Sequence, residues 1–390
     1  MASRTEPLKE EPAHDLPVAP ARPEDRVGID DFERHARDRL PQMVYDYYAG
    51  GAGEEWTLRE NVRAFDRWVL RPRVLVDVAK VDLSTTVLGQ PLPFPIMLAP
   101  TAFQRLAHPE GELATARAAS SLGALMVLST ISTVPLEDVA ATGVDRWFQL
   151  YVMQDRSLAE DLVRRAHAAG YRGLVLTVDT PSLGLRLRDV RNRFTLPSDI
   201  TMANLQDITM PGGSGPGGRS TGSDLADFFA AEHDATLSWD DLAWLRSLSP
   251  MPLVLKGVMS FEDARLAADA GVDGIIVSNH GGRQLDGVPA AIHALPEVVD
   301  AVGDQVDVMM DGGIRRGTDI LKALGLGARA VMIGRPYLWG LACDGEEGVR
   351  RVIEMLRDEL VLAMQLAGVS AVAGIDRSLV APAPGLGSLR

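Results

Sequence analysis

Cysteine is almost absent from the sequence: Cys343 is the only one among 390 residues. An intramolecular disulfide therefore cannot form, which excludes a disulfide-stabilised secreted domain and favours a reducing compartment. The sequence also lacks any apolar stretch close to the roughly 20 residues that span a bilayer. It begins without the apolar core of a signal peptide, and its last three residues, SLR, differ from the peroxisomal signal SKL. We therefore expect a cytoplasmic protein.

Basic residues are also fewer than acidic residues. Lys and Arg number 39 against 53 Asp and Glu, which gives a formal net charge of -14 at pH 7. A field of this sign repels nucleic acid and anionic membrane surfaces, so neither is expected as a partner. With 46% hydrophobic residues, the chain is long enough for one large α/β barrel or for two domains.

Two segments have compositions that disfavour packing. Residues 1–25 are rich in Pro, Glu, Arg and Ala, so burial cannot offset their ordering entropy, and we expect a disordered tail. Residues 210–223 read MPGGSGPGGRSTGS, which predicts a mobile loop inside the domain. The remaining chain, residues 26–390, is interpreted as a single domain.

Eight short runs of β-branched and other apolar residues recur along the chain with helical segments between them. This alternation favours a (β/α)8 TIM barrel, although a doubly wound open sheet would share it. We also expect a helical segment before the barrel and an extended loop after the fourth strand. The runs are Ile96–Ala99, Ala124–Leu128, Trp147–Tyr151, Gly173–Val178, Leu253–Lys256, Gly274–Val277, Val306–Met310 and Ala330–Ile333.

The connection between the fifth and sixth runs shows the helical pattern best. Ser260 is a suitable N-cap, with Asp263 three residues later, and Gly271 is placed to end the helix. One side of this helix is predicted to be apolar. The residues on that side are Ala264, Leu266, Ala267 and Ala270.

Polar residues follow each of the eight runs. In a (β/α)8 barrel all these strand ends meet on the face where active sites lie, so their recurrence predicts a site there. Taken singly, each could instead be a strand-end group bonded to loop backbone. In chain order they are Thr101, Ser129, Gln149 with Tyr151, Thr177 with Asp179, Lys256, His280 with Arg283, Asp311 with Arg315, and Gly334 with Arg335.

His280 and Arg283 stand three residues apart just after the sixth run. An imidazole titrates near neutrality and can move a proton, while a guanidinium stays charged and can hold a carboxylate through two hydrogen bonds. The pair indicates proton removal beside a carboxylate. No metal site is proposed, and the other histidines are interpreted as structural or surface residues.

The last two runs are followed by DGGIRRG (311–317) and IGRP (333–336). Barrels often bind phosphate at this place through backbone N–H groups and a helix N-terminus. Gly312, Gly313 and Gly334 would allow close approach of the backbone, and Arg315 and Arg335 would supply charge. A lone DGG is also a common tight turn, but the two motifs together favour an anion site.

These motifs resemble those of the FMN-dependent α-hydroxy acid oxidases and dehydrogenases, a family that includes glycolate, lactate and mandelate or hydroxymandelate oxidases. The resemblance extends from about Ile29 to the C-terminal region and implies the same (β/α)8 barrel. It is carried by LPQMVYDYYAGGA (40–52), APTAFQRLAHPEGE (99–112), FQLYV (148–152), LTVDTPSLGLRLRDVRNRF (176–194), LKGV (255–258), SNHGGRQLDG (278–287), DGGIRRGTD (311–319) and IGRP (333–336).

The resemblance implies that His280 is the catalytic base and that Asp179 stabilises its protonated form, which would raise the histidine pKa. Lys256 would lie beside the flavin and stabilise its anionic reduced form. It also implies that Arg186 and Arg283 bind the substrate carboxylate, and that Tyr47 and Tyr151 hydrogen-bond the carboxylate or the reacting oxygen. Two arginines on one carboxylate would orient the substrate over the flavin.

The cofactor implied is FMN, and the reaction implied is oxidation of an (S)-2-hydroxy acid to a 2-oxo acid. Removal of the α-proton and hydride transfer both remain open as routes. The resemblance also implies a homo-oligomer, tetrameric or octameric. The residues implied to bind FMN are Thr101, Ala102, Ser129, Gln149, Thr177, Lys256, Ser278, Asp311, Gly313, Arg315, Gly334 and Arg335.

Three departures from glycolate oxidase bear on the substrate. Ile131 stands where that enzyme has a tryptophan, Phe103 where it has a methionine, and Leu185 where a polar residue is common. Together with Ala102, the first two are predicted to contact the substrate. Loss of an indole would open room for a longer or aromatic side chain, whose burial contributes about 25 cal/mol per Å². We therefore expect a mandelate-like or medium-chain substrate, with lactate as the main competitor.

Oxygen is the simplest electron acceptor, because no haem module is fused, and the product would then be hydrogen peroxide. A dehydrogenase that reduces a quinone or redox protein, and a lactate monooxygenase, remain alternatives. A barrel that binds FMN without turnover is disfavoured, because the histidine and both arginines are present.

Overall fold

The structure is a computed structural model that describes residues 25–205, 222–303 and 305–384. The predicted tail and most of the predicted loop at 210–223 lie outside these ranges. Eight parallel strands form a closed barrel in the order β10-β11-β4-β5-β6-β7-β8-β9. Their bounds are β4 Ile96–Leu98, β5 Met126–Leu128, β6 Arg146–Leu150, β7 Leu174–Thr177, β8 Leu253–Val258, β9 Gly274–Val277, β10 Asp307–Asp311 and β11 Ala330–Ile333.

The closure of the sheet distinguishes the predicted barrel from the open sheet, which the alternation of strands and helices alone would also allow. β11 pairs in parallel with β4, with Val331 opposite Ile96 and Ile333 opposite Leu98, so the sheet has no free edge. The TIM barrel is confirmed and the open sheet is excluded. Each strand begins and ends within two residues of the predicted bounds. The prediction was accurate because a strand that is buried on both faces appears in the sequence as a short continuous run of apolar residues.

Successive side chains of a strand point to opposite faces of the sheet, so in the barrel they alternate between the interior and the outer face, which the helices cover. Side chains such as Met97, Val127 and Trp147 fill the barrel interior. Their neighbours Leu98, Met126 and Phe148 pack outward against the helices. The hairpin of β2 (Thr85–Val87) and β3 (Gln90–Leu92) adds Val87 and Leu92 to the interior cluster and so closes the amino-terminal end of the barrel.

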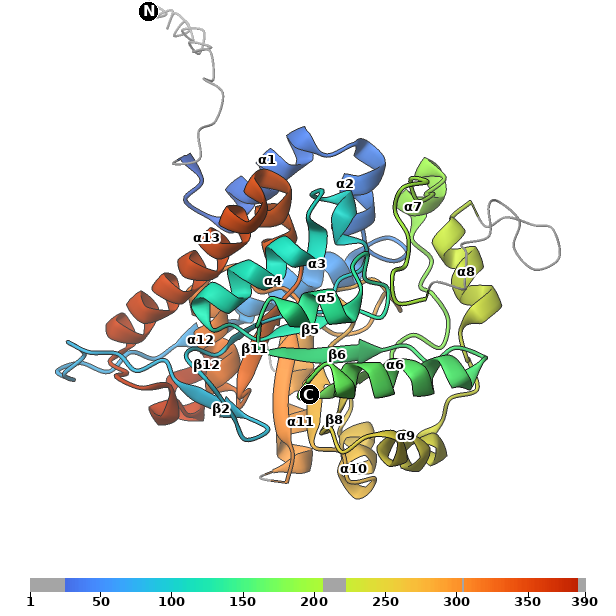
Figure 1. The fold of residues 1–390 in the computed structure, drawn as a ribbon. Helices are drawn as coiled ribbons and strands as arrows, with labels where there is room; N and C mark the ends of the chain where they lie inside the picture. The colour runs from blue at the N-terminus through green and yellow to red at the C-terminus, as the bar shows by residue number, and fades with distance from the viewer. Residues whose placement is uncertain (1–24, 206–221, 304, 385–390) are drawn as a thin grey trace, which may run out of the picture.

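Helices surround the barrel, and α1 and α4 both pack on the long helix α13 (Figure 1). A short antiparallel pair is formed by β1 (Trp68–Leu70), which precedes the barrel, and β12 (Val380–Pro382), which follows α13. Within the described residues, no helix combines the length and the apolar character needed to cross a membrane. The helices are α1 Ile29–Arg39, α2 Gln42–Ala49, α3 Trp56–Arg63, α4 Gly111–Leu122, α5 Leu136–Ala141, α6 Arg156–Ala168, α7 Leu187–Asn192, α8 Asp224–Glu232, α9 Leu242–Leu248, α10 Phe261–Asp269, α11 Ala291–Val302, α12 Gly317–Gly325 and α13 Arg335–Ala367.

Helix α10 tests the predicted capping pattern. The Ser260 hydroxyl accepts a hydrogen bond from the Asp263 backbone N–H at 3.2 Å, so the predicted N-cap is confirmed. Gly271, with φ +71°, follows the helix as expected for a C-terminal glycine. Of the predicted apolar side, Ala264 and Ala267 are buried and Ala270 packs against the core, whereas Leu266 is 46% exposed, so the prediction is wrong at Leu266 alone.

Candidate active site

A cavity of about 1010 Å³ lies at the carboxyl ends of the barrel strands. The wall is formed by most of the side chains predicted from the strand ends, together with residues from α2 and from the long connection between β7 and β8. The predicted site residues that line it are Tyr47, Thr101, Ala102, Ser129, Ile131, Tyr151, Arg186, Lys256, His280, Arg283, Asp311, Gly313, Arg315, Gly334 and Arg335.

Five predicted site residues stand behind this wall. The Gln149 side-chain N–H donates to the Thr177 hydroxyl at 3.0 Å, so these two bind each other across β6 and β7. Phe103 is fully buried, with its ring 6.0 Å from that of Tyr47. Its expected direct contact with the substrate is therefore not supported, and it can shape the cavity only by packing against Tyr47. Asp179 and Ser278 act through the side chains that they contact, as described next.

His280 reaches the cavity through an unusual backbone conformation. Its φ is +58°, in the left-handed region that non-glycine residues rarely adopt, and Gly281 and Gly282 follow at +63° and +75°. A Cβ on Gly282 would lie 2.6 Å from the backbone of Leu58 on α3, so only glycine fits there. The NHGG run is thus a tight turn that directs the imidazole from the end of β9 into the cavity.

The imidazole and a carboxylate form a pair at the barrel rim. The His280 Nδ1 lies 2.9 Å from Asp179 Oδ1, which leaves Nε2 as the nitrogen available to the cavity. An ionised carboxylate only accepts hydrogen bonds, so this contact assigns the proton of the neutral ring to Nδ1. The free Nε2 can then accept a proton from a bound molecule.

Burial and Asp179 shift the pKa of His280 in opposite directions. Burial lowers the pKa of His280 below its ordinary value, and this outweighs the opposing effect of Asp179, while Lys256 lowers it further. The contribution of Asp179 to the His280 pKa thus has the expected direction, and burial reverses the net shift. For Asp179, burial alone would raise the pKa, but His280 and Lys256 bring it below the usual value. The pair at neutral pH is a neutral imidazole beside an ionised carboxylate.

Lys256 is held in a buried polar triangle. Its Nζ lies 3.1 Å from Asp311 Oδ2 and donates to the Ser278 hydroxyl at 3.0 Å, and that hydroxyl donates to Asp311 Oδ1 at 2.6 Å. Burial lowers the pKa of Lys256, but Asp311 and Asp179 raise it to a net value above that of a free lysine. The side chain is therefore a fixed cation in the cavity wall.

Two arginines face the cavity next to His280. Arg186 is 7% exposed, and its Nε is buried without a hydrogen-bond partner among the described residues. Burial and the neighbouring Arg283 lower the pKa of Arg186 to about 10. Arg283 donates to the carbonyls of Tyr47 and Gly50 at 2.7 and 2.9 Å and stacks over the Tyr47 ring. Both guanidinium groups thus keep donors for an anion in the cavity.

Tyrosines from two different elements complete this part of the wall. The Tyr47 ring stacks on Phe194 at a centroid distance of 4.5 Å, and Tyr151 packs edge-on against Phe229 at 5.3 Å. Burial raises the pKa of both hydroxyls, so they stay protonated and can donate hydrogen bonds. The neighbouring Tyr48 instead donates to the Phe103 carbonyl at 2.7 Å.

Charge in the cavity wall shows what the site can hold. Its charged side chains are Lys256, Arg186, Arg283, Arg315 and Arg335, against the single carboxylate of Asp311. Burial lowers the pKa of both Arg315 and Arg335, so each would gain from a nearby anion. A phosphate and a carboxylate are the anions that such a donor set binds best.

The glycines fit the phosphate end of FMN. Gly334 precedes α13, whose N-terminus opens into the cavity, and a Cβ on Gly334 would meet no atom closer than 3.7 Å. Gly313, with φ +83°, is needed because a Cβ would lie 2.0 Å from the Asn61 carbonyl oxygen. Backbone N–H groups and a helix N-terminus beside two arginines form a phosphate site. The residues present therefore fit FMN.

Sequence reasoning missed Asn61, on α3. Its side-chain amide exchanges two hydrogen bonds of 2.8 Å with that of Asn279, and its oxygen also accepts from the Ala291 backbone N–H. The residue thereby joins the His280 turn to the DGG turn. Neither periodicity nor a strand-end position singles out Asn61, so only the three-dimensional structure identifies it.

Comparisons with known proteins agree with this geometry. Residues 36–382 match the model of the FMN-dependent dehydrogenase family. The chain is 52% identical to glycolate oxidase 3 of Arabidopsis thaliana over 90% of this chain and 95% of the relative. It is 53% identical to an L-lactate oxidase of Nostoc sp., covering 91% and 98%. A crystal structure of mandelate oxidase with (S)-4-hydroxymandelic acid superposes with a TM-score of 0.87 at 46% identity, covering 91% and 99%.

Proposed function

Because the chain belongs to the family of FMN-dependent α-hydroxy acid oxidases, we propose that its substrate is an (S)-2-hydroxy acid larger than glycolate and its electron acceptor is O₂. The products would be the 2-oxo acid and hydrogen peroxide. The enzyme class and FMN follow from the family, whereas the identity of the substrate and of the acceptor is the proposal. Homo-oligomeric assembly and a cytoplasmic location stay predictions.

The cavity residues divide into binding and proton-transfer roles. The guanidinium groups of Arg186 and Arg283 hold the substrate carboxylate, which places the substrate hydroxyl within reach of His280. His280 accepts a proton at Nε2, and the imidazolium that forms is stabilised by Asp179 at Nδ1. Tyr151, which remains protonated, donates a hydrogen bond to an oxygen of the substrate.

FMN, when bound, supplies a two-electron acceptor. The cationic Lys256 favours negative charge in its neighbourhood, and Asp311 and Ser278 keep the ammonium group in place. Arg315, Arg335 and the turn at Gly313 would hold the phosphate of FMN.

The apolar wall of the cavity carries the proposal on substrate size. Ile131 lines the cavity together with Leu183, Leu225 and Phe229, and none of these four side chains offers a hydrogen bond. Ile131 stands where glycolate oxidase has a tryptophan, so this chain has more room beside the substrate Cα. An aryl or alkyl group placed there would be stabilised by burial in proportion to its apolar area. Glycolate has no such group and would gain nothing from this wall.

The test is an anaerobic titration of purified holoenzyme with (S)-mandelate, (S)-lactate and glycolate, following flavin absorbance, after which air is admitted. Bleaching by mandelate followed by rapid reoxidation with stoichiometric peroxide is the expected result. The variant Ile131→Trp should lower kcat/KM for mandelate about tenfold or more, because the indole refills the space, while glycolate is affected less. Equal kcat/KM for glycolate and mandelate in the unmodified enzyme would contradict the proposed substrate class.

The same titration separates the alternatives. Reoxidation that is slow in air but fast with a quinone would identify a dehydrogenase. Release of CO₂ with a carboxylic acid one carbon shorter would identify a monooxygenase. A flavin bleached by no hydroxy acid would contradict the catalytic roles of His280 and Arg283.

A further inference from the structure

Helix α7 and the residues next to it supply part of the active-site wall. Arg186 stands at the N-cap position of α7 and Leu183 precedes it, and both line the active-site cavity. Phe194 lies just after the helix, and its ring stacks on that of Tyr47 on α2 at a centroid distance of 4.5 Å. The position of α7 therefore determines where the Arg186 guanidinium enters the cavity.

Helix α7 is too short to hold this position by itself. It has six residues, whereas isolated helices shorter than about 12–15 residues are marginal in water. Asp189 is its only buried residue, and the apolar Leu187 and Val190 are only partly covered. Contacts with neighbouring elements must therefore fix α7, which lies beside α2 (Figure 1).

Arg188 joins α7 to two carboxylates outside the helix. Its Nη1 donates to Asp46 Oδ1 on α2 at 3.2 Å, and its Nη2 donates to Glu55 Oε2 at 2.7 Å. Asn192, one turn further along α7, donates to Asp46 Oδ2 at 2.9 Å. Burial lowers the pKa of Arg188, but Glu55 and Asp46 raise it to a net value above the usual one. The ion pairs therefore persist at neutral pH.

The stem of Arg188 packs on a turn that also anchors the second arginine of the substrate site. The Gly50 carbonyl accepts a hydrogen bond from Arg283 at 2.9 Å. A Cβ built on Gly50 would lie 3.3 Å from Arg188 Cδ, so the aliphatic part of Arg188 contacts the same turn. Arg283 is thus fixed to this turn directly, and Arg186 is fixed to it through α7 and Arg188.

We propose that Arg188 is a positioning residue for substrate binding: by bridging Asp46 and Glu55 it fixes α7 on α2 and so places Arg186 to meet the substrate carboxylate. Arg188 does not line the cavity, so it acts through Arg186 and does not touch the substrate. Two guanidinium groups share one carboxylate only at a fixed separation, and a displacement of about 1 Å can cost about a hundredfold in rate. The inference rests on the proposed role of Arg186 in binding that carboxylate.

The first experiment compares Arg188→Met and Arg188→Lys with the unmodified holoenzyme, using whichever of (S)-mandelate, (S)-lactate and glycolate it oxidises fastest. Arg188→Met keeps an unbranched stem without the charge. It should raise KM about tenfold and change kcat less than about threefold, because the carboxylate is held in both the ground state and the transition state. Arg188→Lys should recover part of the KM, since an ammonium group can reach one carboxylate but lacks the planar fork that spans two.

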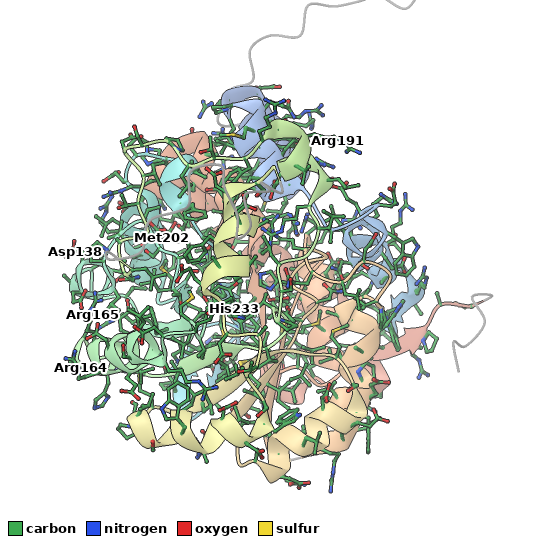
Figure 2. All side chains as sticks on the ribbon, turned by 90° about the vertical axis from the view of Figure 1, so that its right-hand side faces the viewer. Asp138, Arg164, Arg165, Arg191, Met202 and His233 are labelled. Carbon is green, nitrogen blue, oxygen red and sulfur yellow. The ribbon has the colours of Figure 1, made fainter. Side chains whose placement is uncertain are left out.

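Arg191→Met is the matched control. Arg191, labelled in Figure 2, is an exposed residue of the same helix, and its replacement removes the same charge from α7. This variant should leave KM unchanged. Equal increases of KM in Arg188→Met and Arg191→Met would show a general effect of charge and would overturn the inference.

Asp46→Asn tests whether Arg188 acts through its partner. The single variant should also raise KM, and the double variant with Arg188→Met should raise it by less than the product of the two single effects, because both changes remove one shared contact. Single effects that simply multiply would show that the two residues act independently, which contradicts the proposed bridge.

A binding measurement separates this inference from the proposed function. Oxalate has carboxylates but no hydroxyl-bearing carbon to oxidise, and equilibrium dialysis against the holoenzyme gives its Kd. A Kd raised about tenfold in Arg188→Met, with Arg191→Met unchanged, supports the inference even if no hydroxy acid bleaches the flavin, an outcome that contradicts only the proposed function. The inference is overturned by an unchanged Kd in Arg188→Met, with or without a lower thermal midpoint, or by an unmodified holoenzyme that binds no oxalate.

Discussion

At the residue scale, His280 combines a left-handed backbone with a buried ring whose pKa lies below that of a free imidazole. Both features cost stability, and such costs concentrate at functional sites. A base must be unprotonated to work, so a lowered pKa keeps His280 competent at neutral pH and moderately below it. Activity should therefore be present above this pKa and disappear as the pH falls through it.

Asp179→Asn should separate the two contributions to that pKa. Asp179 raises the His280 pKa while burial lowers it, so loss of the carboxylate charge should move the acid limb of kcat/KM to lower pH. The plateau rate should fall by about tenfold or more, because the imidazolium formed during proton transfer loses its partner. The measurement is kcat/KM across pH for the variant and the unmodified enzyme. A limb that moves to higher pH would show that Asp179 does not act on His280 as a charge.

The sequence predicted the residues of the cavity better than their geometry. Strand-end position and family motifs correctly predicted fifteen of the residues that line the cavity. The same reasoning could not tell Phe103, which packs behind Tyr47, from Ile131, which reaches the cavity, because both follow strands at similar offsets. The net direction of the His280 pKa shift could not be predicted from the sequence, since it depends on a competition between burial and the charge of Asp179 that motifs do not record.

At the scale of elements, the strands were predictable because each is buried on both faces and bounded by polar residues. Closure of the barrel could not be predicted from the alternation of strands and helices, which closed and open sheets share, and was implied only by the family resemblance. The contribution of α3 was missed for a similar reason. Its side chains act on turns that are more than 200 residues away in sequence, as the Asn61–Asn279 pair does, and no local pattern encodes that contact.

Asn61→Ala should reveal what that contact contributes. The change leaves the Ala291 N–H without its partner and removes two hydrogen bonds from the Asn279 amide, which keeps those to the Pro289 carbonyl and the Gly282 N–H. The free energy of unfolding should fall by about 1–3 kcal/mol. FMN should also be held less tightly, because α3 packs under the turn at Gly313. Urea unfolding and FMN release on dilution measure the two effects. Asn192→Ala, on a partly exposed asparagine that binds Asp46, serves as the control, and equal losses in both variants would contradict a special role for Asn61.

At the scale of the whole molecule, net charge and local charge have opposite signs. The chain carries -14 overall, yet five cationic side chains line the cavity at one end of the barrel. Acidic residues on the surface balance these cations only at long range, where solvent screens the interaction. Repulsion among the buried cations should therefore oppose folding unless an anion occupies the site.

Removal of FMN should for this reason lower the thermal midpoint by several degrees, since a ligand that binds only the folded state stabilises it by mass action. Inorganic phosphate added to the apoprotein should restore part of the loss, because it can occupy the site formed by Arg315, Arg335 and the N-terminus of α13. Sodium chloride at equal ionic strength is the control and should restore less, because screening alone does not supply the hydrogen bonds. Differential scanning calorimetry of apoprotein, holoenzyme and apoprotein with each salt measures these midpoints. If chloride stabilised the apoprotein as much as phosphate, the effect would be general screening of charge, and the argument for a specific phosphate site at this end of the barrel would fail.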